Sequence, residues 1–318
     1  MQTEEQRFVA KVAYMYHELS KKQQAIAEEL DISQATVSRL LKLAIKQGIV
    51  RTTVSMPTGV YPHLEKSLTD QFGLKAAIIV DCDEPDDEVS LQHHIGSAAA
   101  YYVETTINKN ETVGLSSWSS TLLAMVNAMH RVSKPTDARV VQILGGVGNP
   151  SAEIYASRIT ERFANIVQGT AVFLPAPGVA RSPEIHDSML ADPFVQQAVS
   201  LFDDITLALL GIGSIEPSKL LASSGNVFSK EELAALSKAG AVGDICLRFF
   251  DAQGRQITTP RSERVIGMSL QQMKSRKRSV GIAGGQRKIP AILGALRGNW
   301  INVLITDRFT ATELLKQS

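Results

Sequence analysis

The spacing of hydrophobic and polar positions changes once along the chain, near residue 56. Up to residue 55 the apolar residues recur at helical spacing, and this segment ends in a short β-prone run, IVRTTVSM. Residues 56–62, MPTGVYP, then gather two prolines and a glycine, which is the composition of a linker. The pattern predicts a helical domain at 1–55, a linker at 56–62 and a larger domain at 63–318.

The larger domain alternates apolar β-rich runs with amphipathic helices. Most of these runs are continuously apolar, which is typical of strands covered on both faces by crossover helices. The pattern predicts an α/β domain built on a doubly wound, mainly parallel sheet. The expected strands are residues 76–82, 112–117, 138–146, 170–177, 204–213, 243–250, 278–285 and 300–307.

Residues 23–41, QQAIAEELDISQATVSRLL, predict two helices joined by a tight corner at Asp31-Ile32-Ser33. Ser33 can cap the second helix and Gly48 can end it, with GIVRTTVSM forming a hairpin or wing. This is the pattern of a winged helix-turn-helix, and the alternative is a helical bundle used only for protein interactions. The residues expected to face inward are Ala25, Ile26, Leu30, Val37, Leu40 and Leu41.

The second of these helices carries side chains that can read DNA. In a helix-turn-helix its first turns touch base edges in the major groove, where glutamine recognises adenine and arginine recognises guanine. Methyl groups of alanine or threonine can pack on thymine, and nearby lysines can meet phosphates. The predicted DNA-binding residues are Lys21, Lys22, Ser33, Gln34, Ala35, Thr36, Ser38, Arg39 and Lys42.

Composition narrows the possible classes of protein. The chain of 318 residues is 44% hydrophobic and 20% charged, which predicts globular domains and excludes a disordered chain. A net charge of +1 excludes a uniformly basic coat, while residues 1–55 hold eight Lys or Arg against six Asp or Glu. Only two cysteines, Cys82 and Cys246, occur, both in apolar runs, so we expect no disulfide framework, no metal and no cofactor.

The N-terminus and the apolar runs indicate where the protein resides. MQTEEQRF is polar and acidic, unlike a signal peptide, and no apolar run approaches the roughly 18 residues that span a bilayer. We expect a cytoplasmic protein without membrane contact.

A set of motifs gives a more specific expectation. In order, they are QQAIAEELDISQATVSRLLKLAIKQGIV, LGGVGN, GIGSI, SSGNVFS, GAVGDICLRFFDAQG, VIGMSL, GIAGGQRKIPAILGAL and INVLITD. Together they resemble, over nearly the whole chain, the SorC family of bacterial transcriptional regulators. The resemblance implies a winged helix-turn-helix and an effector domain similar to ribose-5-phosphate isomerase and glucosamine-6-phosphate deaminase. It also implies a sugar or sugar-phosphate effector and operator binding as a tetramer.

Three strand ends carry the candidate effector chemistry. In GLSSWSST, residues 114–121, hydroxyl groups run into a helix start, and in AGGQRK, residues 283–288, glycines precede positive charges at another. Asp244 precedes an apolar run and can accept hydrogen bonds from sugar hydroxyls. The alternatives are a serine-rich cap with Trp118 as a packing residue, a glycine turn with solvated charges, and a surface aspartate.

The resemblance assigns these positions to an effector pocket and adds others. Asp244 and Lys288 match an acidic position and a lysine of the family, whereas relatives often have glycine in place of Ser119. Gly145, Gly146 and Tyr155 enter only by their place in the family pattern. The predicted effector-binding residues are Ser117, Trp118, Ser119, Ser120, Thr121, Gly145, Gly146, Tyr155, Asp244, Gly284, Gly285, Gln286, Arg287 and Lys288.

An enzyme is the main alternative, because sheets of this type host sugar-phosphate isomerases and deaminases. Such enzymes need an acid or base beside the reacting carbon. The six histidines show no metal spacing and no association with the glycine loops. We therefore expect a regulator of a carbohydrate-utilisation operon, not an enzyme, that binds double-stranded operator DNA as a homo-oligomer. A pure oligomerisation scaffold would leave AGGQRK and SSWSST without a role.

Overall fold

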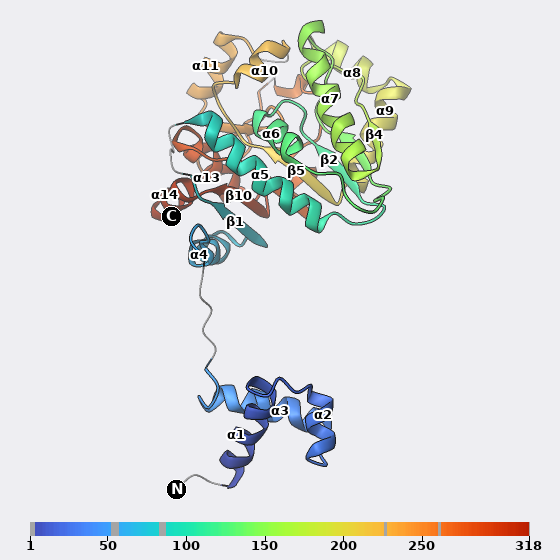
Figure 1. Ribbon diagram of the computed structural model, residues 1–318. Coiled ribbons are helices and arrows are strands. Elements are labelled where there is room, and N and C mark those ends of the chain that lie inside the picture. The colour runs from blue at the N-terminus through green and yellow to red at the C-terminus, as the bar shows by residue number, and fades with distance from the viewer. Residues whose placement is uncertain (1–3, 52–56, 83–86, 226–227, 260–261, 318) are drawn as a thin grey trace. The chain divides into compact units, whose positions relative to one another are not determined.

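The computed structural model describes residues 4–51, 57–82, 87–225, 228–259 and 262–317, with the backbone alone at 150–156 and 219. The chain divides into two compact units, Met1–Thr58 and Gly59–Ser318 (Figure 1). Each unit has its own hydrophobic core, so each is described separately.

The described residues of the first unit form three helices, α1 (Glu4–His17), α2 (Gln23–Glu29) and α3 (Gln34–Lys46). The corner between α2 and α3 forms because Asp31 adopts a left-handed conformation with φ of 52°. Ser33 then caps α3, since its Oγ accepts a hydrogen bond from the Thr36 backbone N–H at 3.1 Å. Gly48, with φ of 71°, lies just beyond the C-cap residue Gln47 and turns the chain away.

The core of this unit forms from the apolar faces of all three helices. Ile26, Val37, Leu40 and Leu41 are buried as expected. Ala25 is exposed, so that prediction is wrong. Ala27 takes the inward position instead, because it lies two residues further along α2, directly after the buried Ile26. The predicted wing hairpin includes residues 52–56, which lie outside the described residues.

The second unit is built on a seven-stranded sheet in which every pairing is parallel. Its order is β1-β10-β9-β5-β2-β3-β4. The strands are β1 (Ala76–Val80), β2 (Thr112–Leu115), β3 (Arg139–Gln142), β4 (Thr170–Val172), β5 (Leu207–Gly211), β9 (Arg278–Ile282) and β10 (Val303–Asp307). The predicted doubly wound α/β fold is confirmed.

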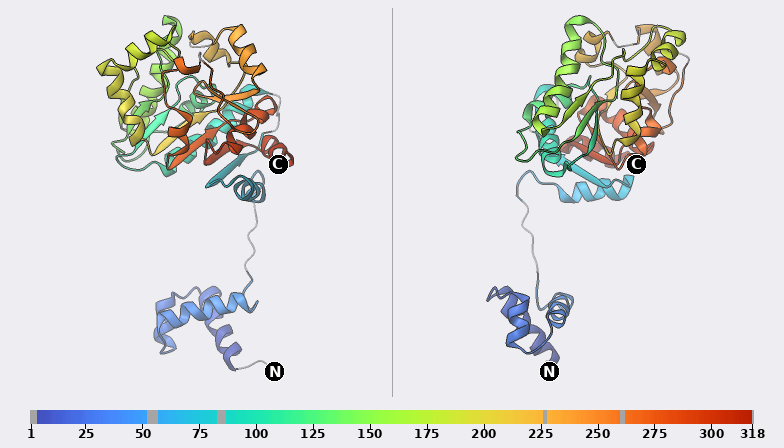
Figure 2. Two further views of the ribbon diagram at one scale, coloured as in Figure 1. Left: turned by 180° about the vertical axis from the view of Figure 1, so that it is seen from behind. Right: turned by 90° about the vertical axis from the view of Figure 1, so that its right-hand side faces the viewer.

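Helices cover both faces of this sheet, as the right-hand view of Figure 2 shows. The α-helices are α4 (Pro62–Phe72), α5 (Glu88–Thr106), α6 (Ser120–Ala128), α7 (Pro150–Val167), α8 (Pro183–Leu190), α9 (Pro193–Ser200), α10 (Lys219–Ser224), α11 (Lys230–Lys238), α12 (Leu270–Lys274), α13 (Ile289–Arg297) and α14 (Arg308–Lys316). The 3-10 helices are η1 (Leu201–Asp204), η2 (Ser262–Arg264) and η3 (Gln286–Lys288).

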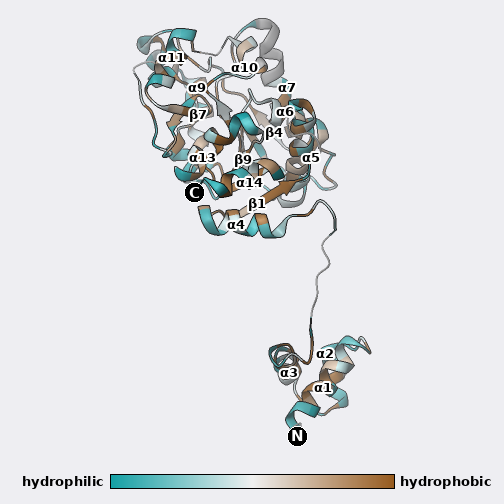
Figure 3. Cartoon of the chain, turned by 90° about the vertical axis from the view of Figure 1, so that its left-hand side faces the viewer, coloured by the Kyte–Doolittle hydropathy of each residue, from teal (hydrophilic) through white to brown (hydrophobic). Residues whose placement is uncertain are grey.

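Alternation along the strands divides the core into two layers. Leu207 and Leu209 of β5 pack in the cluster formed with α5, α6 and α7, while Ala208 and Leu210 pack in the opposite cluster, which includes α4, α9, α13 and α14. Because successive strand residues point to opposite faces, both faces of the strand are apolar. Figure 3 shows the resulting hydrophobic interior and hydrophilic outer helix faces.

The run at 243–250 is not one strand of the main sheet, so that expectation is wrong. The chain instead forms the hairpin β7 (Ala241–Ile245) and β8 (Arg248–Asp251), which pairs antiparallel with β6 (Gly213–Ser214). The turn comprises Cys246 and Leu247, both with positive φ. Neither residue type signals such a turn in a sequence, because asparagine and glycine are the usual ones.

The amino ends of three neighbouring strands are tied by a buried ion pair. Glu111 directly precedes β2, and both of its oxygens accept from Arg278 of β9, at 2.8 and 2.7 Å. Thr206, just before β5, donates to the same carboxylate at 2.8 Å. Burial by itself would raise the pKa of Glu111, but these hydrogen bonds and the Arg278 charge outweigh it and hold the pKa below its usual value.

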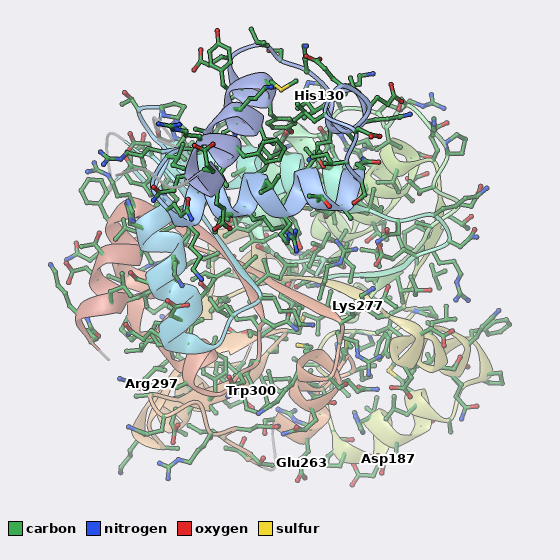
Figure 4. All side chains as sticks on the ribbon, turned by 90° about the horizontal axis from the view of Figure 1, so that it is seen from below. His130, Asp187, Glu263, Lys277, Arg297 and Trp300 are labelled. Atoms are coloured by element: carbon green, nitrogen blue, oxygen red, sulfur yellow. The ribbon has the colours of Figure 1, made fainter. Side chains whose placement is uncertain are left out.

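The turn between α13 and β10 contains Trp300, one of the aromatic residues of the core. Trp300, labelled in Figure 4, is buried there. The Lys274 ammonium lies 5.2 Å from the centre of its ring, and this cation-π contact adds an electrostatic attraction to the packing of the indole.

Candidate functional site

The order of the strands places a crevice between β2 and β5. From β2 the chain proceeds through β3 to β4 on one side, and from β5 through β9 and β10 on the other. Helices therefore diverge at this point, and in open α/β sheets ligands bind beyond the carboxyl ends of the strands at such a switch.

A cleft lies at these carboxyl ends, and the space in it and in front of it, open solvent included, is about 560 Å³. Its walls come from the segment after β2, the end of β5, the β7–β8 hairpin and the segment before α13. The lining residues are Ser116, Trp118, Ser119, Ser120, Leu144, Gly211, Ile212, Gly213, Ser214, Glu216, Pro217, Ser218, Leu221, Asp244, Cys246, Leu247, Arg287 and Lys288.

The segment between β2 and α6 supplies hydroxyl groups. Ser119 is the N-cap of α6, and its Oγ accepts from the Leu122 backbone N–H at 3.3 Å. Gly211 is required beside it, because a Cβ at that position would lie 2.5 Å from Ser119 Oγ. Trp118 donates from Nε1 to the Gly145 carbonyl at 3.1 Å, which fixes the indole against the next loop.

Asp244 is a buried carboxylate at the inner end of the cleft. Its Oδ2 accepts from the Leu247 backbone N–H at 2.8 Å. Burial raises the pKa of Asp244 to about 6, although the Leu247 hydrogen bond and the Lys288 charge oppose the rise. Above that pH it is an anionic acceptor, suited to two neighbouring hydroxyl groups of a ligand.

Lys288 reaches the same cleft from the AGGQRK turn. Burial lowers the pKa of its ammonium, Glu88 and Asp244 oppose this change, and Arg287 adds to it. The turn itself is fixed by Asp307 and Thr310, which accept from the Gly285 backbone N–H at 3.0 and 2.8 Å. Gly285 has φ of 94°, which L-residues rarely adopt.

The structure brings six of the predicted effector-binding residues together in the cleft: Trp118, Ser119, Ser120, Asp244, Arg287 and Lys288. The other predicted positions lie around it. Ser117 and Thr121 are buried, while Gly284, Gly285 and Gln286 line other cavities beside the same turn. The side chain of Tyr155 lies outside the described residues.

Gly145 and Gly146 belong to the packing beneath the cleft. A Cβ on Gly145 would lie 2.3 Å from the Pro177 carbonyl oxygen, and one on Gly146 would lie 2.0 Å from Gln142 Nε2. Glycine at these positions is thus explained by close packing alone.

Sequence reasoning missed the β5 end and the loop that follows it. The lining of the cleft includes Gly213, Ser214, Glu216 and Ser218, whereas the motif GIGSI had served only as a mark of the family. The sequence signal for these residues was the position of GIG at the end of an apolar run, where glycines permit a ligand or another part of the backbone to approach closely. Ser116 belongs to the GLSSWSST segment but was not included in the predicted set. Cys246 was missed because it lies in an apolar run.

Gly213 makes room for Asp244, and this gives a testable prediction. In Gly213→Ala the new Cβ would lie 2.2 Å from Asp244 Oδ1, so we expect a loss of about 1 to 3 kcal/mol in the free energy of unfolding. Urea unfolding measures it. In an Asp244→Ala background the obstructing carboxylate is gone, so the same glycine substitution should cost less. An equal cost in both backgrounds would contradict this contact.

The helices α2 and α3 form the second candidate site, the predicted DNA-binding surface. Gln34, Ala35, Arg39 and Lys42 of α3 are exposed, whereas Ser33 and Thr36 bond to each other through their hydroxyls at 2.8 Å. Ser38 is partly buried. Lys22 is exposed before α2, but Lys21 forms an ion pair with Glu29 and is already engaged.

Metal binding and membrane insertion find no support in the described part of the chain. Within it, no group of three or more His, Cys, Asp or Glu side chains is placed to hold a metal ion. Nor does any helix there combine the length and apolarity needed to cross a membrane.

The chain is similar to known regulatory proteins over nearly its whole length. The sugar-binding domain family model matches residues 60–316. The chain is 33% identical over 315 residues to the deoxyribonucleoside regulator of Bacillus subtilis (strain 168), covering 99% of each. It is 31% identical over 312 residues to the sorbitol operon regulator of Klebsiella pneumoniae, covering 98% of each.

A solved structure extends the likeness to the fold of the whole chain. The crystal structure of full-length SorC from Klebsiella pneumoniae matches with a TM-score of 0.74 and 29% identity, over 99% of this chain and 100% of that one. The resemblance inferred from the ordered motifs is confirmed. The chain belongs to the SorC family of transcriptional regulators, which carry this sugar-binding domain.

Proposed function

We propose that this protein is a DNA-binding transcriptional regulator of a carbohydrate-utilisation operon, and that a sugar or sugar phosphate in the cleft modulates its operator binding. The observation that carries the proposal is the cleft at the β2–β5 switch, where Asp244 and Lys288 face hydroxyl-bearing residues. A carboxylate suits sugar hydroxyls, and an ammonium suits a phosphate or a further hydroxyl. The relatives named for sorbitol and deoxyribonucleosides support this ligand class.

The chemistry of the cleft supports binding without turnover. Burial raises the pKa of Cys246 to about 12, so its thiol is a poor nucleophile at neutral pH. The names of the relatives likewise favour a regulator over the isomerase or deaminase alternative. Ordinary enzyme turnover of phosphosugars by the purified protein would overturn this part of the proposal.

Assembly is part of the proposal. One helix-turn-helix covers few phosphates, and pairing two on half-sites multiplies affinity only when their spacing matches the DNA repeat. A homo-oligomer, in the proposed form a tetramer in the cytoplasm, supplies that pairing. Operator titration of the purified protein with and without candidate sugars tests the function. If none of the sugars that bind the protein changes its affinity for operator DNA, the proposed function is contradicted.

The exposed face of α3 predicts distinct outcomes for two substitutions. Arg39→Ala should weaken operator binding by about 1 to 3 kcal/mol and relax discrimination at one base pair. Lys22→Ala should weaken binding to all sequences and reduce the salt dependence, because it removes a phosphate contact. Titrations of operator and scrambled DNA at several salt concentrations distinguish the two. Unchanged operator affinity in Arg39→Ala would exclude this placement of the recognition helix.

A further inference from the structure

The turn at the tip of the β7–β8 hairpin has an unusual backbone for its residues. Ile245 pairs with Arg248, so Cys246 and Leu247 form a two-residue loop, with φ of 51° and 61°. A loop with two left-handed residues normally uses asparagine and glycine, because a Cβ is unfavourable there. A leucine held in this conformation indicates that its side chain has a use at this position.

The side chain of Leu247 lies at a boundary between two cavities. It lines the ligand cleft, and it also lines a smaller cavity behind the cleft. Pro217 and Leu221 line both spaces as well, as do the polar residues Ser214 and Asp244. Pro217, Leu221 and Leu247 therefore form an apolar corner with Ser214 and Asp244 beside it. Behind that corner Phe228 and Phe249 pack edge to face, with ring centres 5.5 Å apart.

The same turn positions the polar group beside that corner. The Leu247 backbone N–H donates to Asp244 Oδ2, and Gly213 leaves space beside Oδ1. One residue thus places an acceptor for hydroxyl groups and an apolar surface next to each other. A ligand that satisfies both has a hydroxyl-bearing carbon next to a carbon without a hydroxyl.

We propose that Leu247 is a specificity-determining residue, and that the apolar corner formed by Pro217, Leu221 and Leu247 selects deoxy sugars over their fully hydroxylated counterparts. The inference rests on the proposed function, because it requires that the cleft bind a sugar or sugar phosphate. A hydroxyl directed at these apolar side chains, and away from Asp244 and Ser214, would lose its hydrogen bonds to water without gaining a partner. An apolar pocket rejects an added hydroxyl by a factor of up to about 100.

The test compares matched pairs of sugars that differ by one hydroxyl. Suitable pairs are ribose and 2-deoxyribose, glucose and 2-deoxyglucose, and galactose and 6-deoxygalactose, the first two also as their terminal phosphates. Isothermal titration of the full chain measures both dissociation constants of each pair. We expect one deoxy member to bind about 10- to 100-fold more tightly than its partner. The phosphorylated arms show separately whether the cleft requires an anion.

Substitution of Leu247 should change that ratio. Leu247→Asn keeps a side chain of similar size that tolerates the left-handed backbone but replaces the apolar surface with an amide. The preference for the deoxy sugar should fall toward unity. The matched control is Leu233→Asn, which alters the cavity behind the corner without lining the cleft. The control should keep the ratio of the parent protein. If Leu247→Asn does not fold, Leu247→Gly relieves the turn, removes the apolar surface and serves the same comparison.

The outcomes separate this inference from the proposed function. Binding of both members of every pair with equal affinity, or tighter binding of the hydroxylated members, overturns the role of Leu247 and leaves a sugar-responsive regulator. An equal loss of preference in Leu233→Asn also overturns it, since the effect would not come from the cleft wall. Failure of the full chain to bind any of these sugars or phosphates overturns both.

Discussion

Replacing Glu111 with glutamine should lower the free energy of unfolding of the larger unit by about 3 to 5 kcal/mol. The side chains of Glu111 and Arg278 are only 5% and 14% exposed. The substitution keeps the size of the side chain but leaves the Arg278 guanidinium as a buried charge without its counter-ion. Removal of one partner from a buried ion pair is costly because the charge of the other partner stays buried without compensation. This holds even where the intact pair itself contributes little to stability.

Urea unfolding followed by tryptophan fluorescence measures this effect in the full chain. The chain has two tryptophans, Trp118 and Trp300, and both lie in the larger unit, so the signal reports that unit alone. The control is Asp70→Asn in α4, which breaks the Lys66–Asp70 pair, with side chains 73% and 63% exposed. An exposed pair contributes at most about 1 kcal/mol. A loss in Glu111→Gln as small as that of the control would refute the prediction.

The pH dependence of stability should show the same interaction. The folded-state pKa of Glu111 is lowered, so its contribution to stability is fully present above the unfolded-state pKa. It is lost as the pH falls through the folded-state value, because protonation then favours the unfolded chain. Between neutral and acidic pH the parent protein should therefore lose more stability than Glu111→Gln.

Lys288→Ala should abolish the response of operator affinity to ligand while leaving ligand-free DNA binding nearly unchanged. In the parent protein we expect the ligand to change operator affinity by about 5- to 150-fold, the usual range of coupling between two sites. Lys288 lines the cleft and its charge acts on Asp244, so we expect its loss to remove contacts to the ligand. The predicted recognition helix α3 lies in the other unit and should keep its own affinity for DNA.

Operator titrations with and without a sugar that binds the parent protein test this expectation. Lys277→Ala is the matched control, because Lys277 is an exposed lysine just before β9, whereas Lys288 follows the other end of the same strand. The control should respond to ligand as the parent does. A full ligand response in Lys288→Ala would remove this lysine from the effector site.

Local patterns were sufficient for most of the fold. Seven of the eight apolar runs form the parallel sheet, because strands buried on both faces have to be apolar along their whole length. The prediction for the eighth run, residues 243–250, was wrong for the same reason, since the strands of a buried hairpin are equally apolar. Ser33 and Gly48 could be assigned to the ends of α3 because caps depend on a few neighbouring residues.

The ligand cleft was harder to predict because its residues are distant in sequence. Ser117 and Thr121 were included for their hydroxyl groups, yet both are buried away from the cleft lining, while Ser116 faces the cleft. The direction of a side chain just after a strand depends on how the loop packs, and no local pattern records it. Gly213 and Leu247 were missed because their importance comes from contacts with Asp244.

The helix-turn-helix corner, the parallel α/β sheet and, through the ordered motifs, the family could all be predicted from the amino-acid sequence. These features depend on hydrophobic periodicity, capping residues and glycine positions, all of which act over a few residues. The folded structure was needed to show that β5 returns to lie beside β2, and that the β7–β8 hairpin lines the cleft at the resulting switch point. Strand order and side-chain direction depend on long-range packing, so the composition of the cleft could be determined only from the folded chain.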